Sequence, residues 1–457
     1  MKKYFAAFSA LVFCLSALLS DALAQSGALD LTFNPGTGIA SGKVRAITLQ
    51  TNGSILIAGN FSSVNGVSRN NIARLNSDGG LDSGFVPGAG PGGDVLTMAV
   101  QTNGMVVIGG NFTFVNAIPR LYLARLRSDA SLDLAFNPVA NGPVESMLLQ
   151  ADGKILIAGS FTSVNSTNRN RIARLNSDGS LDLGFDPGLG ANNAIHAIAL
   201  QTNGMILVGG SFTTMNTSNR YYVARLNSDG SLDTGFDVGF VGGSFVSRLE
   251  IKGDGKAVIA GVFSSIDGYS RQSVAQLLTN GIVDASFAPQ VGPLVSGDGI
   301  RALAVQPDGK VIVGGTFADG NGAVGAVRLN ADGNIDSAFF SRVNLSVFSL
   351  AVQPDTKVLI GGDFFTVNGT NMGRIARLKG DGSPPAGLQF LAPNKYFGAY
   401  LSGTVSNSYR VEWTTDLNTP SLWTPLSNVT LQASPQFILD PTPAIGRQRY
   451  YRAVALP

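Results

Sequence analysis

Seven near-copies of one sequence unit, spaced close to 50 residues apart, account for most of this chain. Each copy contains an apolar run that ends in a glycine, and a phenylalanine follows that glycine by two positions. The glycines are Gly59, Gly110, Gly159, Gly210, Gly261, Gly315 and Gly362, and the phenylalanines are Phe61, Phe112, Phe161, Phe212, Phe263, Phe317 and Phe364. A repeat of this period is typical of folds in which each copy packs against its neighbours. The chain is therefore constrained to a repeat architecture.

Each unit divides into four short segments that have the pattern of β-strands. In the first unit these are residues 44–50, 54–61, 71–76 and 81–85, and tight turns of sequence TNG and SDG follow the first and the third. The 57 glycines of the chain, many of them in Asn-Gly and Asp-Gly pairs, also favour tight turns between strands. Four strands per unit predict a propeller blade, whose apolar faces are buried when blades stack around a ring. We therefore predict an all-β fold with a seven-bladed β-propeller.

The last segment of the unit also occurs alone, at the start of the repeat region. Residues 28–36 (ALDLTFNPG) have no unit in front of them, and the last unit lacks this segment. The aspartates of the segment are Asp30, Asp82, Asp133, Asp182, Asp233, Asp284 and Asp336. We therefore expect residues 28–34 to supply the outermost strand of the blade whose other strands come from residues 347–378, so that the ring is closed by the N-terminal strand.

The repeated residues resemble the delta-60 repeat family, whose units have the pattern AIALQPDGKILVGGxF followed by IARLNxDGSLDxxF. The matching stretches are ALAVQPDGKVIVGGTF at residues 302–317 and RIARLNSDGSLDLGF at residues 171–185. The resemblance extends over roughly residues 27–382 and implies an exported bacterial β-propeller. It brings no settled activity, so no catalytic residue is carried over. Unit five has AQLLTNG where other units have ARLNSDG, and unit six has ADGNG in place of the VNG loop, so these two blades are expected to be irregular.

The first 24 residues have the pattern of a signal peptide. Lys2 and Lys3 precede an apolar run, and residues 22–24 (ALA) form a small-x-small cleavage site. We expect cleavage after Ala24 and a secreted protein, either extracellular or periplasmic. Cys14 is the one cysteine of the chain and is lost with this segment, so no disulfide is expected. No second long apolar run follows, which argues against a membrane span.

Residues 383–386 (SPPA) are predicted to be a linker, because two prolines there interrupt strand pairing. The propeller is accordingly assigned to residues 25–382 and a second domain to residues 387–457. This second domain has four strand-like segments and is predicted to be a small β-sandwich, which resembles fibronectin-like modules of secreted bacterial proteins. Its aromatic residues are Trp413, Trp423, Tyr450 and Tyr451. We expect them to form a core, in preference to a platform on which sugars stack.

Several repeated or isolated residues are better explained by structure than by chemistry. The arginine of the ARL motif recurs in most units together with the segment aspartate, and we expect the two to pair within each blade. The NSDG turns have glycine at the fourth position, whereas an EF-hand calcium loop requires it at the sixth. His196 is the one histidine, so a multi-histidine metal site is excluded, and neither a metal nor a cofactor is predicted.

The most informative position is one at which similar units differ. The second residue of the first segment is in turn Arg45, Leu96, Glu145, His196, Ser247, Arg301 and Phe348, between positions that are far more uniform. Strand direction places these residues near one mouth of the central channel, on the face where the long connections between blades open. We predict a ligand site of Arg45, Glu145, His196, Arg301 and Phe348 that could hold an anionic sugar or peptide. The alternative is that these side chains only line a water-filled channel.

Three functions remain open from the sequence. The first is a non-enzymatic, monomeric binding scaffold for a protein, peptide or polysaccharide, with the C-terminal module as a spacer or attachment piece. A net charge of +2 and a charged content of 14% argue against a nucleic-acid partner. The second is a carbohydrate-active lyase or hydrolase that uses Glu145, His196 and the two arginines as acid, base and charge stabilisers. The third is a purely structural adhesion or surface protein, which should have no pocket. The separation of Glu145 and His196 distinguishes the first two.

Overall fold

The computed structural model describes residues 26–289, 295–318 and 323–381, and residues 387–391, 397–402, 408–414, 424–430, 436–440 and 450–455 of the C-terminal part. All regular elements among these residues are β-strands, and the described part contains no helix that could cross a membrane. The chain divides into a larger unit, Gly27–Val352 with Leu359–Leu378, and a second unit that includes Gln353–Val358 and Lys379–Pro457. The predicted signal peptide and linker lie outside the described residues.

Seven sheets, called blades one to seven, make up the larger unit. Their first strands are β1 (Lys43–Leu49), β6 (Asp94–Val100), β11 (Val144–Leu149), β16 (Ile195–Leu200), β21 (Val241–Ile251), β25 (Val295–Val305) and β29 (Val347–Val352). Their second strands are β2 (Ile55–Asn60), β7 (Val106–Asn111), β12 (Ile155–Gly159), β17 (Ile206–Gly210), β22 (Ala257–Ile266), β26 (Val311–Ala318) and β30 (Val358–Gly362). Their third strands are β5 (Ile72–Leu75), β10 (Leu123–Leu126), β15 (Ile172–Leu175), β20 (Val223–Leu226), β24 (Val274–Leu277), β27 (Ala323–Leu329) and β33 (Ile375–Leu378).

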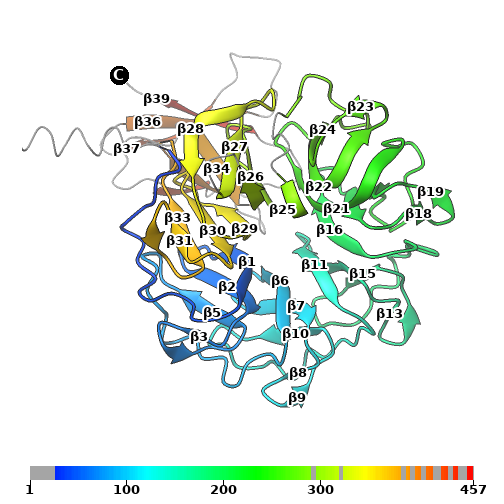
Figure 1. The fold of residues 1–457 in the computed structure, drawn as a ribbon, viewed down its shortest axis with the longest axis horizontal. Helices are drawn as coiled ribbons and strands as arrows, with labels where there is room; N and C mark the ends of the chain where they lie inside the picture. The colour runs from blue at the N-terminus through cyan, green and yellow to red at the C-terminus, as the bar shows by residue number, and fades with distance from the viewer. Residues whose placement is uncertain are drawn as a thin grey trace, which may run out of the picture. The chain divides into compact units, whose positions relative to one another are not determined.

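The blades follow one another around a common centre, with their first strands innermost (Figure 1). Within each blade the second strand lies between the first and the third. Each first strand contacts the first strand of the next blade, and β29 of blade seven contacts β1 of blade one. The repeat and the all-β class predicted from the sequence are therefore confirmed.

The second strands are buried along almost their whole length because each blade is covered on both faces. In blade one, Leu56 and Ala58 pack in a cluster with residues of blade two, whereas Ile55 and Ile57 pack in a cluster that includes Leu359 of blade seven. Successive side chains of a strand point to opposite faces. Both faces must therefore be apolar, which explains the continuous apolar run in every unit.

The fourth segment of the unit differs from the expected strand. In five blades it makes a single antiparallel bridge to the third strand, as between Leu75 and Leu81 in blade one. The chain turns away at once, because the aspartate side chain accepts a hydrogen bond from the backbone two residues later, as from Gly84 N to Asp82 Oδ1 at 2.8 Å. Blade six is different: its fourth segment forms a regular strand, β28 (Ile335–Ser341). Four-stranded blades are thus not the rule.

Blade five departs from the repeat at the position that the sequence indicated. Gln276 replaces the repeated arginine, and its side-chain amide donates to Asp284 at 2.8 Å. Lys256 donates to the same carboxylate, also at 2.8 Å. In blade six, residues 319–322 of the ADGNG segment lie outside the described residues.

The repeated arginine of the third strand makes three kinds of contact. In blade one, Arg74 Nε donates to Asp82 Oδ2 at 2.6 Å, and its guanidinium carbon lies 4.8 Å from the centroid of the Phe85 ring. Arg74 also donates to the carbonyl of Ser128 in blade two, at 2.8 Å. The same three contacts recur for Arg125, Arg174, Arg225 and Arg377. The expected arginine–aspartate pairing is present at these five arginines, and each arginine additionally contacts the neighbouring blade.

The isolated N-terminal segment contacts the last repeat. Leu29 forms an antiparallel bridge with Leu378, and Asp30 N donates to the carbonyl of Arg377 at 2.8 Å. The Arg377 side chain pairs with Asp30 Oδ2, also at 2.8 Å, and lies over the buried ring of Phe33. These are the contacts that the fourth segment makes in blades one to four.

Small hairpins replace the loops expected after the second strands. They are β3–β4 (Ser63–Val64, Val67–Ser68), β8–β9 (Phe114–Val115, Ile118–Pro119), β13–β14 (Ser163–Val164, Thr167–Asn168), β18–β19 (Thr214–Met215, Ser218–Asn219) and β31–β32 (Thr366–Val367, Thr370–Asn371), and in blade five β23 (Tyr269–Ser270) pairs with the end of β22. In the first hairpin Asn65 and Gly66 have φ of 51° and 73°. Two positive φ angles characterise the type I′ turn, which fits the twist of a hairpin.

The C-terminal unit contains two three-stranded sheets. One has the order β34 (Gly387–Leu391), β35 (Phe397–Ser402), β38 (Gln436–Asp440), and the other β37 (Thr424–Thr430), β36 (Ser408–Thr414), β39 (Tyr450–Ala455). Trp413 lies opposite Tyr451 in the register of β36 and β39. The packing of the four aromatic side chains, on which the sequence prediction depends, lies outside the described residues.

Backbone strain in the hairpin turns leads to a stability prediction. Thr217 is β-branched and has φ of 66°, where Gly66 stands in blade one. We expect Thr217→Gly to raise the free energy of unfolding by about 1 kcal/mol, because a left-handed backbone is unfavourable for residues with a Cβ atom. Gly66→Ala is the reverse control, since a Cβ atom there meets no atom within 4 Å and only the backbone is strained. Chemical denaturation measures the free energy of unfolding of both variants. If neither variant differed from the parent protein, the proposed backbone strain would be contradicted.

Candidate functional site

A β-bulge at one position places the variable residue of the first strand in blades one to six. In blade one, Val44 pairs with Gly59 and Ala46 with Ala58, so Arg45 is the extra residue between them. The same irregularity leaves Leu96, Glu145, His196, Ser247 and Arg301 unpaired in blades two to six. A bulge re-aims the side chain of its extra residue. The residues that differ between blades are therefore presented together, outside the regular ladder.

The repeated glycine is required by this bulge. A Cβ atom on Gly59 would lie 2.0 Å from the backbone oxygen of Lys43, and one on Gly210 would lie 2.1 Å from that of Ala194. Equally short contacts occur at Gly110, Gly159, Gly261 and Gly362. Since backbone atoms cannot yield as a flexible side chain can, only glycine permits the two strands to approach so closely.

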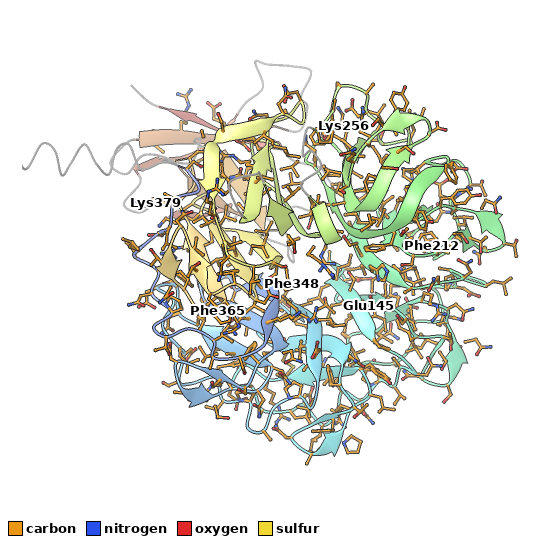
Figure 2. All side chains as sticks on the ribbon, in the orientation of Figure 1. Glu145, Phe212, Lys256, Phe348, Phe365 and Lys379 are labelled. Carbon is orange, nitrogen blue, oxygen red and sulfur yellow. The ribbon has the colours of Figure 1, made fainter. Side chains whose placement is uncertain are left out.

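The seven variable residues line one cavity of about 480 Å³ on the larger unit. Its wall comprises Arg45, Asp94, Leu96, Asn111, Glu145, His196, Ser211, Phe245, Ser247, Arg248, Arg301 and Phe348. Figure 2 shows Glu145 and Phe348, from blades three and seven, on the central side of their sheets. All five residues predicted as a ligand site thus lie at the same cavity.

Glu145 and His196 are hydrogen-bonded to each other. His196 Nδ1 lies 2.7 Å from Glu145 Oε2, and the second carboxylate oxygen accepts from Ser160 Oγ at 2.6 Å. The other ring nitrogen, Nε2, lies 2.7 Å from Ser211 Oγ. The side chains of Glu145 and His196 are 22% and 24% exposed, so both are accessible from the cavity. Because the two groups converge, their separation does not exclude catalysis.

The pKa of Glu145 is held below its ordinary value. Burial of the carboxyl raises this pKa, but the hydrogen bond and charge of His196, the hydroxyl of Ser160 and the charge of Arg248 together outweigh burial. Glu145 is therefore ionised at neutral pH. It cannot serve as the general acid that the sequence suggested for a carbohydrate-active enzyme.

Arg248 is a cavity residue that the sequence analysis missed. It follows the bulge residue of blade five, at a position where the other blades have only small residues: Ala46, Thr97, Ser146, Ala197, Ala302 and Ser349. Its guanidinium donates to the carbonyl of Ser247 at 2.7 Å. Burial and the charges of Arg301 and Arg45 lower its pKa to about 10, against the opposing charge of Glu145. Arg248 therefore remains charged at neutral pH, in the field of two other arginines.

A second set of missed residues lies directly after the repeated glycine. This position holds Asn60, Asn111, Ser160, Ser211, Val262, Thr316 and Asp363 in turn. Asn60 donates to Asp94, while Ser160 and Ser211 contact the Glu145–His196 pair. The sequence could have indicated both Arg248 and these residues, because each of the two positions varies between otherwise similar units.

Phe348 is covered by cations instead of being open for stacking. Only 8% of the residue is exposed. The Lys43 ammonium lies 5.0 Å from the ring centroid, and the guanidinium carbons of Arg45 and Arg301 lie 5.6 Å and 5.7 Å from it. Such contacts are favourable for cations above an aromatic face. Phe348 therefore positions the positive groups of the site.

A second cavity, of about 260 Å³, shares Arg45, Glu145, His196, Arg248 and Phe348 with the first. Its wall also contains Glu250. Burial raises the pKa of Glu250 to about 7, although the positive charge of Arg248 opposes this shift. Glu250 is exposed at this cavity, and exposure to solvent opposes the shift. The two glutamates of the channel thus have pKa values shifted in opposite directions. Among the described residues, no group of three or more His, Cys, Asp or Glu side chains is arranged for a metal ion.

Similarity to known proteins agrees with the fold. The WD40 β-propeller domain of Doa1 is 13% identical, with a TM-score of 0.50 over 78% of this chain and 95% of that domain. Streptogramin B lyase is 16% identical, with a TM-score of 0.48 over 76% of this chain and 96% of that one. No protein with a curated description matches the chain. At these identities the similarity to the WD40 domain shows only that the two folds are alike, and no conclusion is drawn from the similarity to the lyase.

The repeats match a family described as a domain of unknown function (DUF5122) beta-propeller. The matched residues are 50–85, 101–136, 150–185, 201–236, 252–287, 306–339 and 353–384. These seven matches coincide with the seven units of the sequence and together cover more than half of the chain. The chain therefore belongs to the DUF5122 beta-propeller family.

Proposed function

We propose that this protein is an exported β-propeller that binds a small anionic ligand, an acidic saccharide, in the cavity at the channel mouth. The observation that carries this proposal is the convergence of three arginines, Arg45, Arg248 and Arg301, on one cavity of about 480 Å³. This volume is within the usual range of small-molecule sites. A purely structural protein was expected to have no pocket, so the cavity favours binding.

Electrostatics favour an anion over a neutral ligand. Arg45 and Arg301 both lower the pKa of Arg248, which means that the three charges repel one another in a partly enclosed space. The two carboxylates of the wall already have partners, since Asp94 accepts from Arg45 at 3.2 Å and Glu145 is bonded to His196. An anion between Arg248 and Arg301 relieves this repulsion and gains charge-assisted hydrogen bonds.

Polar neutral groups of the wall favour a saccharide over a simple ion. Asn111, Ser211 and Ser247 line the same cavity as the arginines. Amides and hydroxyls can both donate to and accept from sugar hydroxyls. The carboxylate of an acidic sugar would meet the arginines while its hydroxyls meet these groups. In this proposal the C-terminal unit is a fibronectin-like spacer, and the chain acts outside the cytoplasm as a monomer after removal of residues 1–24.

We also propose that the N-terminal segment closes the ring. The support is the set of contacts between Leu29, Asp30 and Phe33 and the last repeat. Arg377 donates in turn to the carbonyl of Ser77 in blade one, at 2.7 Å. Blade seven is thus tied both to the start of the chain and to the first blade, which stabilises the geometry of the central cavity.

The binding proposal is tested by calorimetry with digalacturonate, using its neutral methyl ester as the matched ligand. We expect the acid to bind and the ester to bind at least tenfold more weakly, because hydrogen bonds to charged groups contribute about 1.5 to 3 kcal/mol. Arg248→Ala copies the residue of blades one, four and six and should weaken binding of the acid by a similar factor. Arg127→Gln, at a half-exposed arginine outside the cavity, is the control. Equal binding of acid and ester would contradict the proposal.

The channel glutamate leads to a pH prediction. Glu250 is neutral below a pKa of about 7 and negatively charged above it, next to Arg248. A sugar carboxylate is ionised throughout this range, so its affinity should fall as pH rises from 6 to 8, because Glu250 then competes for the arginine. Glu250→Gln should bind equally at both pH values. Calorimetry at the two pH values measures the affinities. If the affinity of Glu250→Gln fell with pH as much as that of the parent, Glu250 would be ruled out as the cause.

Closure is tested through the stability contributed by Asp30. Burial raises its pKa, but hydrogen bonds from Thr32 and the charge of Arg377 outweigh this and lower it to about 2. A depressed folded-state pKa stabilises the fold above the unfolded value near 4, and this stabilisation is lost as pH falls through 2. Asp30→Asn should therefore cost about 2 kcal/mol at pH 7 and little at pH 2. Asp182→Asn is the matched comparison, because Asp182 is the corresponding aspartate of blade three and its pKa is also lowered to about 2. No loss at pH 7 for Asp30→Asn would contradict closure.

A further inference from the structure

Three side chains of the cavity form one hydrogen-bonded line. Ser211 Oγ lies 2.7 Å from His196 Nε2, and His196 Nδ1 lies 2.7 Å from Glu145 Oε2. Ser160 holds the second oxygen of this carboxylate at 2.6 Å, and the backbone N–H of Ser211 donates to Ala194 O at 2.9 Å. Both ends of the line are thus fixed by further hydrogen bonds.

The ionised carboxylate decides the direction of these bonds. Glu145 can only accept when it is ionised, as its lowered pKa indicates, so His196 Nδ1 must carry the proton between them. In the neutral imidazole, Nε2 then has the free lone pair, and the Ser211 hydroxyl donates to it. A serine hydroxyl that donates to an imidazole oriented by a carboxylate is the arrangement of an activated nucleophile.

The repeat explains why this line occurs at one place among the described residues. Ser211 stands after the repeated glycine of blade four, His196 is the bulge residue of the same blade, and Glu145 is the bulge residue of blade three. In blades one and two the corresponding positions hold Asn60, Arg45, Asn111 and Leu96, none of which is a base. Ser211, His196 and Glu145 all line the open cavity, so a substrate can reach the hydroxyl.

We propose that Ser211 is the nucleophile of an esterase site, with His196 as its general base and Glu145 as the group that orients the imidazole. Ser211 Oγ forms a bond to the carbonyl carbon of an ester, and its proton passes to His196 Nε2. The carbon–oxygen bond to the alcohol then breaks, and Nε2 returns the proton to the departing oxygen. Water attacks the acyl-serine by the same route, giving the carboxylic acid and free Ser211.

Arg248 and Arg301 line the same cavity and supply positive charge for the ester substrate. They can stabilise the oxygen that becomes negative during attack, or bind a carboxylate elsewhere on the substrate. The preferred substrate class is therefore an ester that carries a negative charge, such as an O-acylated acidic saccharide. This substrate class depends on the proposed anion binding, whereas the nucleophile itself does not.

The nucleophile is tested with a fluorophosphonate probe on the full chain, followed by digestion and mass spectrometry. We expect a phosphonyl adduct on Ser211. Ser211→Asn, the residue of blades one and two at this position, should abolish it, and Ser128→Ala, at an exposed turn serine, should not. His196→Leu, the residue of blade two, should slow labelling by about 100-fold or more, as expected for loss of a general base. Labelling that omits Ser211, or that is as fast in His196→Leu, would overturn the proposal.

The role of Glu145 is tested separately from its effect on folding. Glu145→Gln preserves the shape of the side chain but removes the charge that fixes the Nδ1–H tautomer, so labelling should slow while the melting temperature changes little. Should this variant unfold, Ser160→Ala is the second probe, because it loosens the carboxylate without removing it. Labelling at the parent rate in a folded Glu145→Gln would overturn the assignment of Glu145.

Substrate charge is tested with 4-acetoxybenzoate and its neutral methyl ester, which share one scissile acetyl ester. We expect kcat/KM to be about tenfold higher for the anion, and this preference to be lost in Arg248→Ala. Labelling of Ser211 together with equal rates for the two esters would support the nucleophile and overturn the anionic class. Binding of digalacturonate without any labelling of Ser211 would overturn the esterase site and leave the proposed binding function standing.

Discussion

The close approach of two backbones at the repeated glycine is the constraint on which the site depends. At Gly59 and its counterparts, the first strand bulges so far toward the second that no side chain fits. In blades one to six the bulge releases one residue from the ladder and directs it to the centre. Because stacking fixes the blades relative to one another, these released residues line a single cavity. The invariant part of the repeat builds the cavity, and the variable part determines its chemistry.

Sequence reasoning predicted the repeat, the all-β class and the position of the cavity, because packing and the bulge follow from periodicity and glycine. It did not predict the single bridge in place of the fourth strand, since the Asx turn at Asp82 depends on side-chain geometry that strand propensity does not contain. Arg248 was not predicted, because it follows the variable bulge residue at a position where the other blades have only small residues. The Ser211–His196–Glu145 line could not be derived from spacing, because it joins positions in two blades across the bulge.

Charged side chains are concentrated in the channel of a chain that has few of them overall. Only 14% of the residues are charged, yet three arginines, two glutamates and a histidine face the two central cavities. Enclosure strengthens their mutual effects, which lower the pKa of Glu145, whereas burial raises that of Glu250. Blade five contributes both Arg248 and Glu250, at positions where most other blades have small residues. One divergent blade therefore sets much of the charge of an otherwise regular ring.

The contact between Asp30 and Arg377 joins residues 347 positions apart. During synthesis the earlier partner leaves the ribosome first and must wait until nearly all of the repeats have been made. Contacts of such long range form late, since the entropy of closing so large a loop must be overcome before they contribute. Each blade between them can meanwhile pack on the one before it. The segment made first thus contacts the repeat made last, and a prematurely terminated chain would lack the partner of this segment.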